Sequence, residues 1–209
     1  MPPMKLQPSP FRSAQQKRDD REAKRLALLL AAVEAFNERG FHATSLDDVA
    51  ASLGVSKPTI YHYLGNKDQV LLECLTLGLV QLREAAEAAR NENGNGLSRL
   101  KSFLKRFAEI NMEDFGRCVI RTGEENLSTE SAQRCRTLKR EVDAAMRGFI
   151  QEGMADSSIT PGDTKLVAFT LAGAINWTAR WHVPGGPLSA QDIAAQMVDI
   201  LTQGLAPRP

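Results

Sequence analysis

The residues with the clearest chemical potential lie between Gly54 and Lys67, in the stretch G-V-S-K-P-T-I-Y-H-Y-L-G-N-K. At about 100° per residue, Ile60 and Leu64 share one face of a helix. The remaining surface carries groups that can form hydrogen bonds: Lys57, Thr59, Tyr61, His62 and Tyr63. A cation, hydroxyls and an imidazole on one helix face are suited to binding the phosphates and base edges of nucleic acid.

The elements around this stretch predict how its polar face is positioned. Ser56 is a good N-cap for the helix, and Gly65 ends it. Before it, Ser45 can cap another helix with Asp48 three residues on, and Gly54 supplies a turn between the two. The expected buried stripe of the earlier helix is Leu46, Val49, Ala50 and Leu53. This arrangement predicts a helix-turn-helix whose second helix carries the polar face.

In such a motif, the N-terminal residues of the second helix reach base edges in the major groove. Lys57 can bind a guanine or a phosphate, and Thr59 a phosphate or a thymine methyl group. Tyr61 and Tyr63 can extend their hydroxyls to phosphates on either wall of the groove. Lys67, at the start of the next helix, adds a cation to backbone N–H groups that favour an anion. The alternative is that this aromatic face packs on the rest of the chain.

Two longer periodic segments flank the motif. Residues 24–40 repeat apolar side chains at spacings of three and four, which predicts an amphipathic helix. Its expected buried stripe is Leu26, Leu29, Leu30, Val33 and Phe36 or Asn37. Asn66 can cap a long helix that runs to about residue 90, and the turn-rich N-E-N-G-N-G at 91–96 ends it. Apolar positions crowd the first half of this helix and then thin out, as in a connector between two cores.

These segments divide the chain into three predicted parts. Residues 1–20 form a disordered basic arm, residues 21–68 a helix-turn-helix DNA-binding domain, and residues 69–209 a dimerisation domain. Over residues 1–25 seven basic side chains face three acidic ones, whereas the whole chain has a net charge of +1. This excess suits a modest contact with phosphates, and a solvated tail is equally consistent with it.

Beyond the 91–96 turn, every segment predicts a helix, so the expected fold class is all-α. Its two parts are an N-terminal three-helix helix-turn-helix domain and a C-terminal helical bundle. Thr160-Pro161 with Asp163 is a start signal for a helix that continues to Trp181, and Ser189 with Asp192 opens the last helix. Small side chains at 171–174 and an apolar stripe on the last helix suit close packing against a second copy. We therefore predict a homodimer through the last two helices, with packing inside one chain as the alternative.

Composition and motifs exclude several classes of protein. An apolar content of 43% and a charged content of 24% are typical of soluble globular proteins. The sequence has no apolar run of about 18 residues and no secretory signal, so we expect a cytoplasmic protein with no membrane partner. Cys74, Cys118 and Cys135 lack C-x-x-C spacing and are expected to be core thiols, with a redox sensor as the alternative. The chain has no phosphate-loop, metalloprotease or nucleophile-elbow motif, so we predict no enzyme, no metal and no cofactor.

Residues 24–72, and above all the run from F-N-E-R-G to N-K-D-Q-V-L, resemble the N-terminal DNA-binding domain of the TetR family of bacterial transcriptional regulators. The matching positions are Gly40-Phe41, Thr44-Ser45, Val49-Ala50, Leu53-Gly54-Val55-Ser56, Ile60-Tyr61 and Asn66-Lys67. Leu64 stands where the family usually has Phe, at an inward site, so the difference concerns packing. Carried over by position, the resemblance implies these DNA contacts: Ser45, Lys57, Thr59, Tyr61, His62, Tyr63 and Lys67.

The resemblance also implies the biological role. TetR-family proteins are homodimers with an all-helical ligand domain, and most repress transcription until a small molecule binds. The resemblance therefore implies that residues 69–209 form a ligand-binding and dimerisation domain. The expected partners are therefore a palindromic operator in double-stranded DNA, a second copy of the chain and a small-molecule effector that releases the DNA. The long helix from Asn66 would transmit the signal, because it starts in one domain and ends in the other.

The effector is expected to be a small apolar or acyl-type molecule. The segment N-W-T-A-R-W-H-V-P-G-G-P-L-S resembles a subset of TetR regulators that includes sensors of acyl-CoA or related lipid metabolites. The candidate pocket residues are Phe103, Phe107, Met112, Phe115, Met146, Phe149, Phe169 and Trp177. Arg121, or Arg117, could bind an anionic head group. For each of these residues an ordinary core or surface position is the alternative.

Two other classes of function remain open from the sequence. The chain could be a helical adaptor whose tyrosine-rich face binds a protein. It could also be a small-molecule enzyme that kept the fold of a DNA-binding ancestor.

Overall fold

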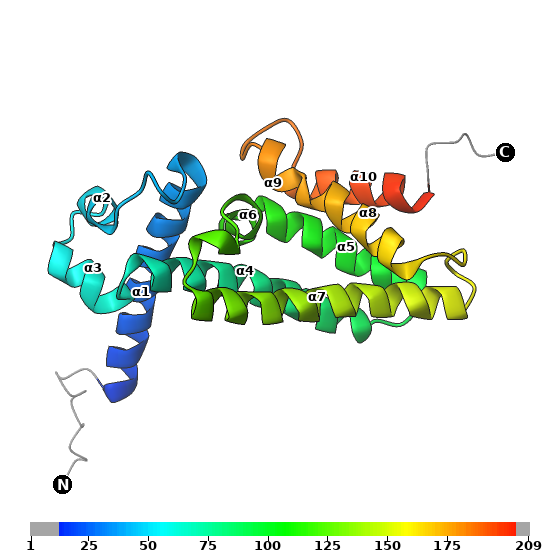
Figure 1. The fold of residues 1–209 in the computed structure, drawn as a ribbon, viewed down its shortest axis with the longest axis horizontal. Helices are drawn as coiled ribbons and strands as arrows, with labels where there is room; N and C mark the ends of the chain where they lie inside the picture. Colours follow the sequence, from blue (N-terminus) through cyan, green and yellow to red (C-terminus); the bar gives the residue numbers. More distant parts are fainter. Residues whose placement is uncertain (1–12, 204–209) are drawn as a thin grey trace, which may run out of the picture.

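The computed structural model describes residues 13–203, and every regular element within them is helical. In chain order the helices are α1 (Ala14–Arg39), α2 (Leu46–Ser52), α3 (Lys57–Leu64), α4 (Lys67–Arg90), α5 (Gly96–Met112), α6 (Asp114–Arg121), the 3₁₀ helix η1 (Glu124–Asn126), α7 (Thr129–Ala155), α8 (Thr164–Asn176), α9 (Thr178–Trp181) and α10 (Ala190–Gln203). Figure 1 shows α1–α3 at one end, a bundle of α5–α10 at the other, and α4 running between them. The predicted all-α class is confirmed.

The caps of α2 and α3 form as the sequence predicted. The Ser45 hydroxyl accepts the backbone N–H of Asp48, and the Asp48 carboxylate accepts that of Ser45. Ser56 caps α3 by accepting the Thr59 N–H. Gly54 turns the chain between the two helices with φ +65°, a conformation that suits glycine. These contacts build the helix-turn-helix.

Helix α1 begins at Ala14, earlier than the predicted domain start at residue 21. Ser13 and Gln16 form a capping box, in which each side chain accepts the other residue's backbone N–H. Residues 14–20 are therefore helical, which corrects the prediction that they belong to a disordered arm. The rest of that arm, residues 1–12, lies outside the described residues.

Parts of two predicted apolar stripes are wrong. Leu26, Leu30 and Leu53 are each more than 40% exposed. The buried residues of α1 are instead Leu28, Leu29, Ala32, Val33, Ala35, Phe36 and Asn37. The stripe shifts because α1 packs against α2 and α3 and also against α4 and α6, so its buried arc is set by two groups of neighbours. Leu53 lies at the C-cap of α2, beyond the turns that pack.

Helix α4 belongs to both ends of the molecule. It contacts α1 and α3 near its start, and it packs against α5, α6 and α7. Val70, Leu71, Cys74 and Leu75 are fully buried in its first half, and a continuous apolar core extends from α1 through α4 to α10. The predicted role of this helix as a connector agrees with that packing.

The three cysteines are buried and free, as the sequence predicted for core thiols. Burial raises the pKa of Cys118 to about 11. Burial also raises the pKa of Cys74 well above its ordinary value. These thiols stay protonated at neutral pH, which makes them poor nucleophiles.

The helix predicted to run from Thr160 to Trp181 begins later, at Thr164, and is divided into α8 and α9 at Trp177. Beside the break, the Thr178 hydroxyl donates to the carbonyl of Ile175, a local bond that competes with a regular helical ladder. Of the start signal at 160–163, only Asp163 caps the helix, because Thr160 and Pro161 precede it, whereas the Ser189 signal was correct. Asp163 accepts backbone N–H groups at the start of α8, and Ser189 accepts the N–H of Asp192 at the start of α10.

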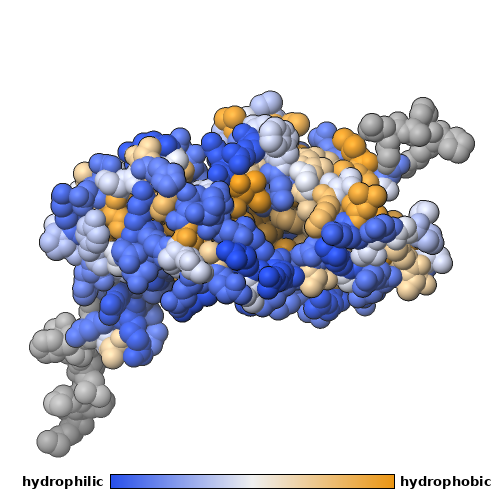
Figure 2. All heavy atoms as spheres, viewed as in Figure 1, coloured by the Kyte–Doolittle hydropathy of each residue, from blue (hydrophilic) through white to orange (hydrophobic). Residues whose placement is uncertain are grey.

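Apolar side chains are exposed around the last three helices. The large ones are Leu166, Phe169, Trp177, Trp181, Val183, Leu188 and Ile200. In Figure 2, hydrophobic groups gather on the α8–α10 side of the bundle, while the opposite end is largely hydrophilic. Within residues 13–203, no helix is long and apolar enough to span a membrane.

Close contact between α5 and α6 requires Gly116. A Cβ atom added there would lie 2.0 Å from the carbonyl oxygen of Ile110, which is backbone and cannot rotate away. Gly148, in α7, provides a contrast because a Cβ atom added there would meet nothing within 4 Å.

We predict that Gly116→Ala lowers the free energy of unfolding by about 1–3 kcal/mol, because the backbone of α5 or α6 must shift. Gly148→Ala is the matched control, and it should be neutral or stabilising by up to about 1 kcal/mol, since alanine favours helix. Urea unfolding followed by circular dichroism measures both. Equal stability of the two variants would contradict the predicted close contact.

Candidate DNA-binding face and ligand cavity

Helix α3 is held by its inner face and presents its outer face to solvent. Ile60 and Leu64 are buried, whereas Tyr61 is 48% exposed and His62 is also exposed. Tyr63 is half-buried against the core, and its carbonyl accepts a hydrogen bond from Arg25. Of the two tyrosines, Tyr61 is therefore the freer to meet a partner.

The other predicted DNA contacts have partners within the chain. The Lys57 ammonium lies 2.7 Å from the Asp47 carboxylate, and this hydrogen bond raises the lysine pKa. The Thr59 hydroxyl lies 2.8 Å from that of Ser56. Ser45 serves as the α2 cap. Because exposed ion pairs and hydrogen bonds contribute little stability, such groups can exchange these partners for phosphates.

The sequence predicted Lys67 as a cation that binds phosphate, and in the structure this side chain already has an aromatic partner. Its ammonium lies 4.1 Å from the centre of the Phe41 ring, and burial lowers its pKa. The cation is thus stacked on an aromatic face, which stabilises its position. It lies in the first turn of α4, whose N-cap is Asn66.

The first turns of α1 add cations to the same surface. Lys17, Arg21 and Lys24, together with Asp20, lie along a groove of about 270 Å³ that His62 and Tyr63 complete from α3. The sequence predicted a basic segment over residues 1–25 with a modest phosphate contact, but it assigned residues 1–20 to a disordered arm and so missed that Lys17 lies on a helix. The Ser13-x-x-Gln16 capping box was the signal that could have revealed the helix.

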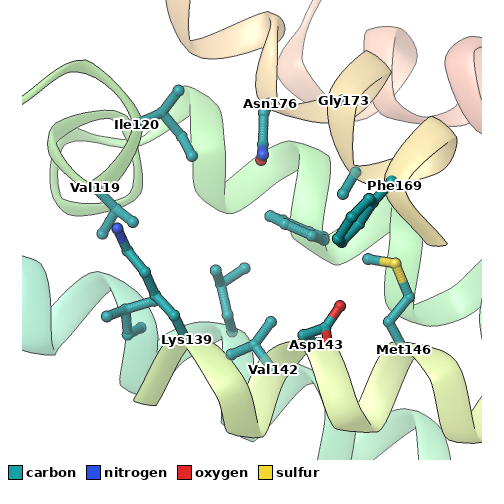
Figure 3. Close-up of a pocket in the computed structure, with 13 residues that line it drawn as sticks. Val119, Ile120, Lys139, Val142, Asp143, Met146, Phe169, Gly173 and Asn176 are labelled. Carbon is teal, nitrogen blue, oxygen red and sulfur yellow. The ribbon is translucent and has the colours of Figure 1, made fainter. Parts of the chain in front are cut away.

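A cavity of about 420 Å³ lies between α4, α5, α6, α7 and α8 (Figure 3). Its lining residues are Leu79, Leu82, Phe107, Val119, Ile120, Lys139, Val142, Asp143, Met146, Phe169, Ala172, Gly173 and Asn176. Three predicted pocket residues are among them, namely Phe107, Met146 and Phe169. The size is suitable for a small organic ligand.

Six other predicted pocket residues lie elsewhere. Phe103 and Phe149 pack on each other in the core, with ring centres 5.7 Å apart. Met112 is buried away from the cavity, and Phe115 is half-buried in α6. Trp177 is 64% exposed, and Arg121 lines a separate hollow between α1, α6 and α9. Helical periodicity indicates which side chains are buried, but it does not indicate which of them border a gap.

The alternative cation, Arg117, donates to the Met112 carbonyl and contacts His182.

Sequence reasoning also missed the polar residues of the cavity. Lys139 and Asp143 project from α7, and Asn176 is the last residue of α8 (Figure 3). The Lys139 ammonium lies 2.5 Å from the Glu124 carboxylate in η1, and this bond lowers the pKa of Glu124. Asp143 pairs with Arg147 at 2.9 Å. The only sequence signal was that both α7 residues flank an apolar stripe, which does not distinguish them from solvated residues.

A hydrogen-bonded link joins the start of α7 to the start of α4. The Asp68 carboxylate accepts the Ser128 N–H at 2.6 Å and the Ser131 hydroxyl at 2.7 Å. Partial burial tends to raise the pKa of Asp68, but the bonds from the two serines outweigh it, so this pKa lies below its ordinary value. The carboxylate also lies at the positive end of α7. The ligand-cavity helix α7 is thereby tied to the residue after Lys67.

Two family models cover most of the chain. Residues 93–205 match the family described as "Tetracyclin repressor-like, C-terminal domain", and residues 28–74 match "Bacterial regulatory proteins, tetR family". The chain belongs to the TetR family. The resemblance predicted from residues 24–72 is thus confirmed, and the members of this family regulate transcription rather than catalyse reactions.

Similar proteins agree with a TetR-family regulator over nearly the whole chain. The HTH-type transcriptional repressor KstR2 of Mycolicibacterium smegmatis is 28% identical over 186 residues, which cover 88% of this chain and 91% of that protein. The crystal structure of the TetR-family regulator PfmR from Thermus thermophilus has a TM-score of 0.79 and 28% identity, covering 86% of this chain and 99% of that one. AibR, solved with isovaleryl coenzyme A and operator DNA, has a TM-score of 0.75 and 22% identity, covering 85% and 97%, and shows a shared fold.

We predict that Asp68→Asn makes this TetR-family protein unfold at a lower temperature at pH 7, because a neutral amide accepts weaker hydrogen bonds from Ser128 and Ser131. A carboxyl group with a lowered pKa stabilises the fold above its unfolded pKa, and this contribution is lost as the pH falls below about 4. The difference between variant and parent should therefore shrink in acid. Thermal unfolding at several pH values measures it. Asp19→Asn, at an exposed position of α1, is the control and should have little effect at any pH.

Proposed function

We propose that this TetR-family protein is a ligand-responsive repressor that binds a palindromic operator as a homodimer and is released by a small apolar or acyl-type ligand. The observation that carries the proposal is that α4 connects an exposed helix-turn-helix directly to a bundle with an apolar cavity. A ligand that prefers one arrangement of that bundle can thereby shift the position of the DNA-binding unit.

The DNA contacts are proposed to come from the outer face of α3 and its surroundings. Tyr61, Lys57 and Thr59 reach base edges or phosphates in the major groove, with His62 and Tyr63 on the same helix. Ser45 and Lys67 bind phosphates at the starts of α2 and α4. The basic first turns of α1 extend this surface along the groove that His62 lines.

The homodimer is proposed to form through α8 and α10. Leu166 and Phe169 on α8 and Trp177 at its C-cap are each more than half exposed, and Ile200 is exposed on α10. Gly173 lies on the same helix with open space where its side chain would be, so another helix can approach closely. Pairing would cover this apolar surface, and the two recognition helices would then read half-sites about 34–36 Å apart.

The effector is proposed to occupy the 420 Å³ cavity, where Phe107, Met146 and Phe169 contact its apolar part. KstR2 is named as a repressor, and AibR was solved with an acyl-CoA and operator DNA. These relatives support a repressor of the same type with an acyl-type ligand. The remaining predicted contacts, which lie outside the cavity, are not part of this proposal.

Selection of bound sequences from random duplex DNA at two salt concentrations tests the function. We expect enrichment of a palindrome whose affinity falls steeply with salt, since phosphate contacts release counterions. If a folded dimer enriches no site, even with added metabolite extract, the regulator hypothesis fails and a protein partner for the Tyr61 face becomes the better explanation.

We predict that Tyr61→Ala weakens operator binding about tenfold or more, because the loss of a hydrogen bond to a charged group costs about 1.5–3 kcal/mol. Tyr61→Phe, which removes only the hydroxyl, separates that bond from the ring contacts. Fluorescence anisotropy with a labelled operator measures both variants. Thermal stability should stay near that of the parent, since the side chain is half exposed. Parental affinity in the alanine variant would count against the assigned face.

We predict that Trp177→Glu converts the dimer to a monomer, because a carboxylate would be buried in an apolar interface without a partner. Leu30→Glu is the control, as it places the same charge at an exposed leucine of α1, and it should leave the dimer intact. Sedimentation velocity or light scattering reports the mass of each. A dimeric Trp177 variant would show that another surface mediates association.

A further inference from the structure

We propose that the ligand of the cavity is an apolar carboxylic acid whose carboxylate is bound by Lys139, with Asn176 as a second donor. This inference rests on the proposed effector site and names the chemical class of ligand and the residue that recognises it. It depends on charge, on donor geometry and on the character of the remaining cavity wall.

The charges around Lys139 leave one positive charge without a counterpart. Glu124 accepts two cations of α7, the Lys139 ammonium at 2.5 Å and the Arg136 guanidinium at 3.3 Å. Asp143, the other charged residue of the lining, is already matched by Arg147 at 2.9 Å. This group of three cations and two carboxylates has a net charge of +1. An anionic ligand group would neutralise it, whereas a cationic one would add to the excess.

Asn176 supplies a neutral donor on the other side of the cavity. Its Oδ1 accepts the side-chain N–H of Asn111 at 3.1 Å, and Asn111 is fully buried. The Nδ2 group of Asn176 has no hydrogen-bond partner among residues 13–203, and Figure 3 shows this side chain directed into the cavity. This amide can donate to an acceptor atom of a bound ligand.

The remaining lining residues favour a ligand whose remainder, apart from its carboxylate, is apolar. Leu79, Leu82, Val119 and Val142 surround the cavity together with Phe107 and Met146, and none of them offers a strong hydrogen bond. Sugar hydroxyls or a nucleotide base would lose their hydrogen bonds to water here without replacement. A hydrocarbon chain or ring system would gain from burial.

Binding of the acid would also alter a contact between elements. The ligand carboxylate competes with Glu124 for Lys139, while Arg136 can remain with Glu124. Lys139 would then release η1, which directly precedes the start of α7. Because Ser128 and Ser131 of that start hold Asp68, the change would reach the first turn of α4 beside Lys67.

Isothermal titration calorimetry of the full-length protein with saturated fatty acids of about six to fourteen carbons, each against the alcohol of equal length, tests the ligand class. We expect at least one acid to bind about tenfold or more tightly than its alcohol, the usual size of a charged hydrogen bond. Lys139→Met should abolish this preference. Arg136→Met is the matched control, because it removes the other cation on Glu124 without altering the lining, and it should retain the preference.

Several results would overturn the inference. The protein could bind no acid, or bind acid and alcohol with equal affinity. The preference for the acid could survive in Lys139→Met. The coenzyme A thioester could also bind more tightly than the acid, with an affinity that does not depend on Lys139. Lys139→Gln provides a second neutral variant in case the methionine variant misfolds. Operator binding is measured separately. Acid binding that leaves operator affinity unchanged would uphold the ligand class and contradict release of the operator by this ligand. Operator binding by a protein that binds no acid would contradict the ligand class and leave the DNA-binding function standing.

Discussion

The apolar face of α4 is buried at both of its ends, and the remaining helices are arranged around it. Its first turns pack on α1 and α3, and its length packs on α5, α6 and α7. Any rotation of α4 that improved one set of contacts would expose apolar surface in the other, at a cost of about 25 cal/mol for each Å². Through α4, packing therefore couples α1–α3 to the α5–α10 bundle.

This constraint explains why polar links gather where the two units meet. The pair of Arg25 and Glu73 joins α1 to α4, and the Asn37 side chain donates to the carbonyl of Asp114 in α6. Asp68 binds the start of α7. Each link is directional, so together they select one of the many arrangements that apolar packing alone would tolerate. A conformational change in the α5–α10 bundle must break or redirect some of these bonds in order to move α3.

Local signals made much of the fold predictable, and non-local packing accounts for what was not. Caps such as Ser45, Ser56 and Ser189 act within one turn, so their residue types identified helix starts correctly. The burial of Leu26 and Leu30 was predicted incorrectly because it depends on which helices surround α1. The cavity was predicted least well. Phe103 and Phe107 lie four residues apart on one helix, yet only Phe107 borders the gap, which α7 and α8 define from distant parts of the chain.

The ion pair between Lys57 and Asp47 has a consequence for how affinity should be read from salt titrations. A cation that already has a carboxylate partner brings no net charge to a phosphate until that pair separates, and the freed carboxylate then takes up a counterion of its own. The slope of log affinity against log salt concentration reports the net number of counterions released from protein and DNA on binding. With Lys57 in its proposed DNA contact, that slope would report fewer phosphate contacts than the basic residues make, and modest salt dependence would not by itself mean a small interface.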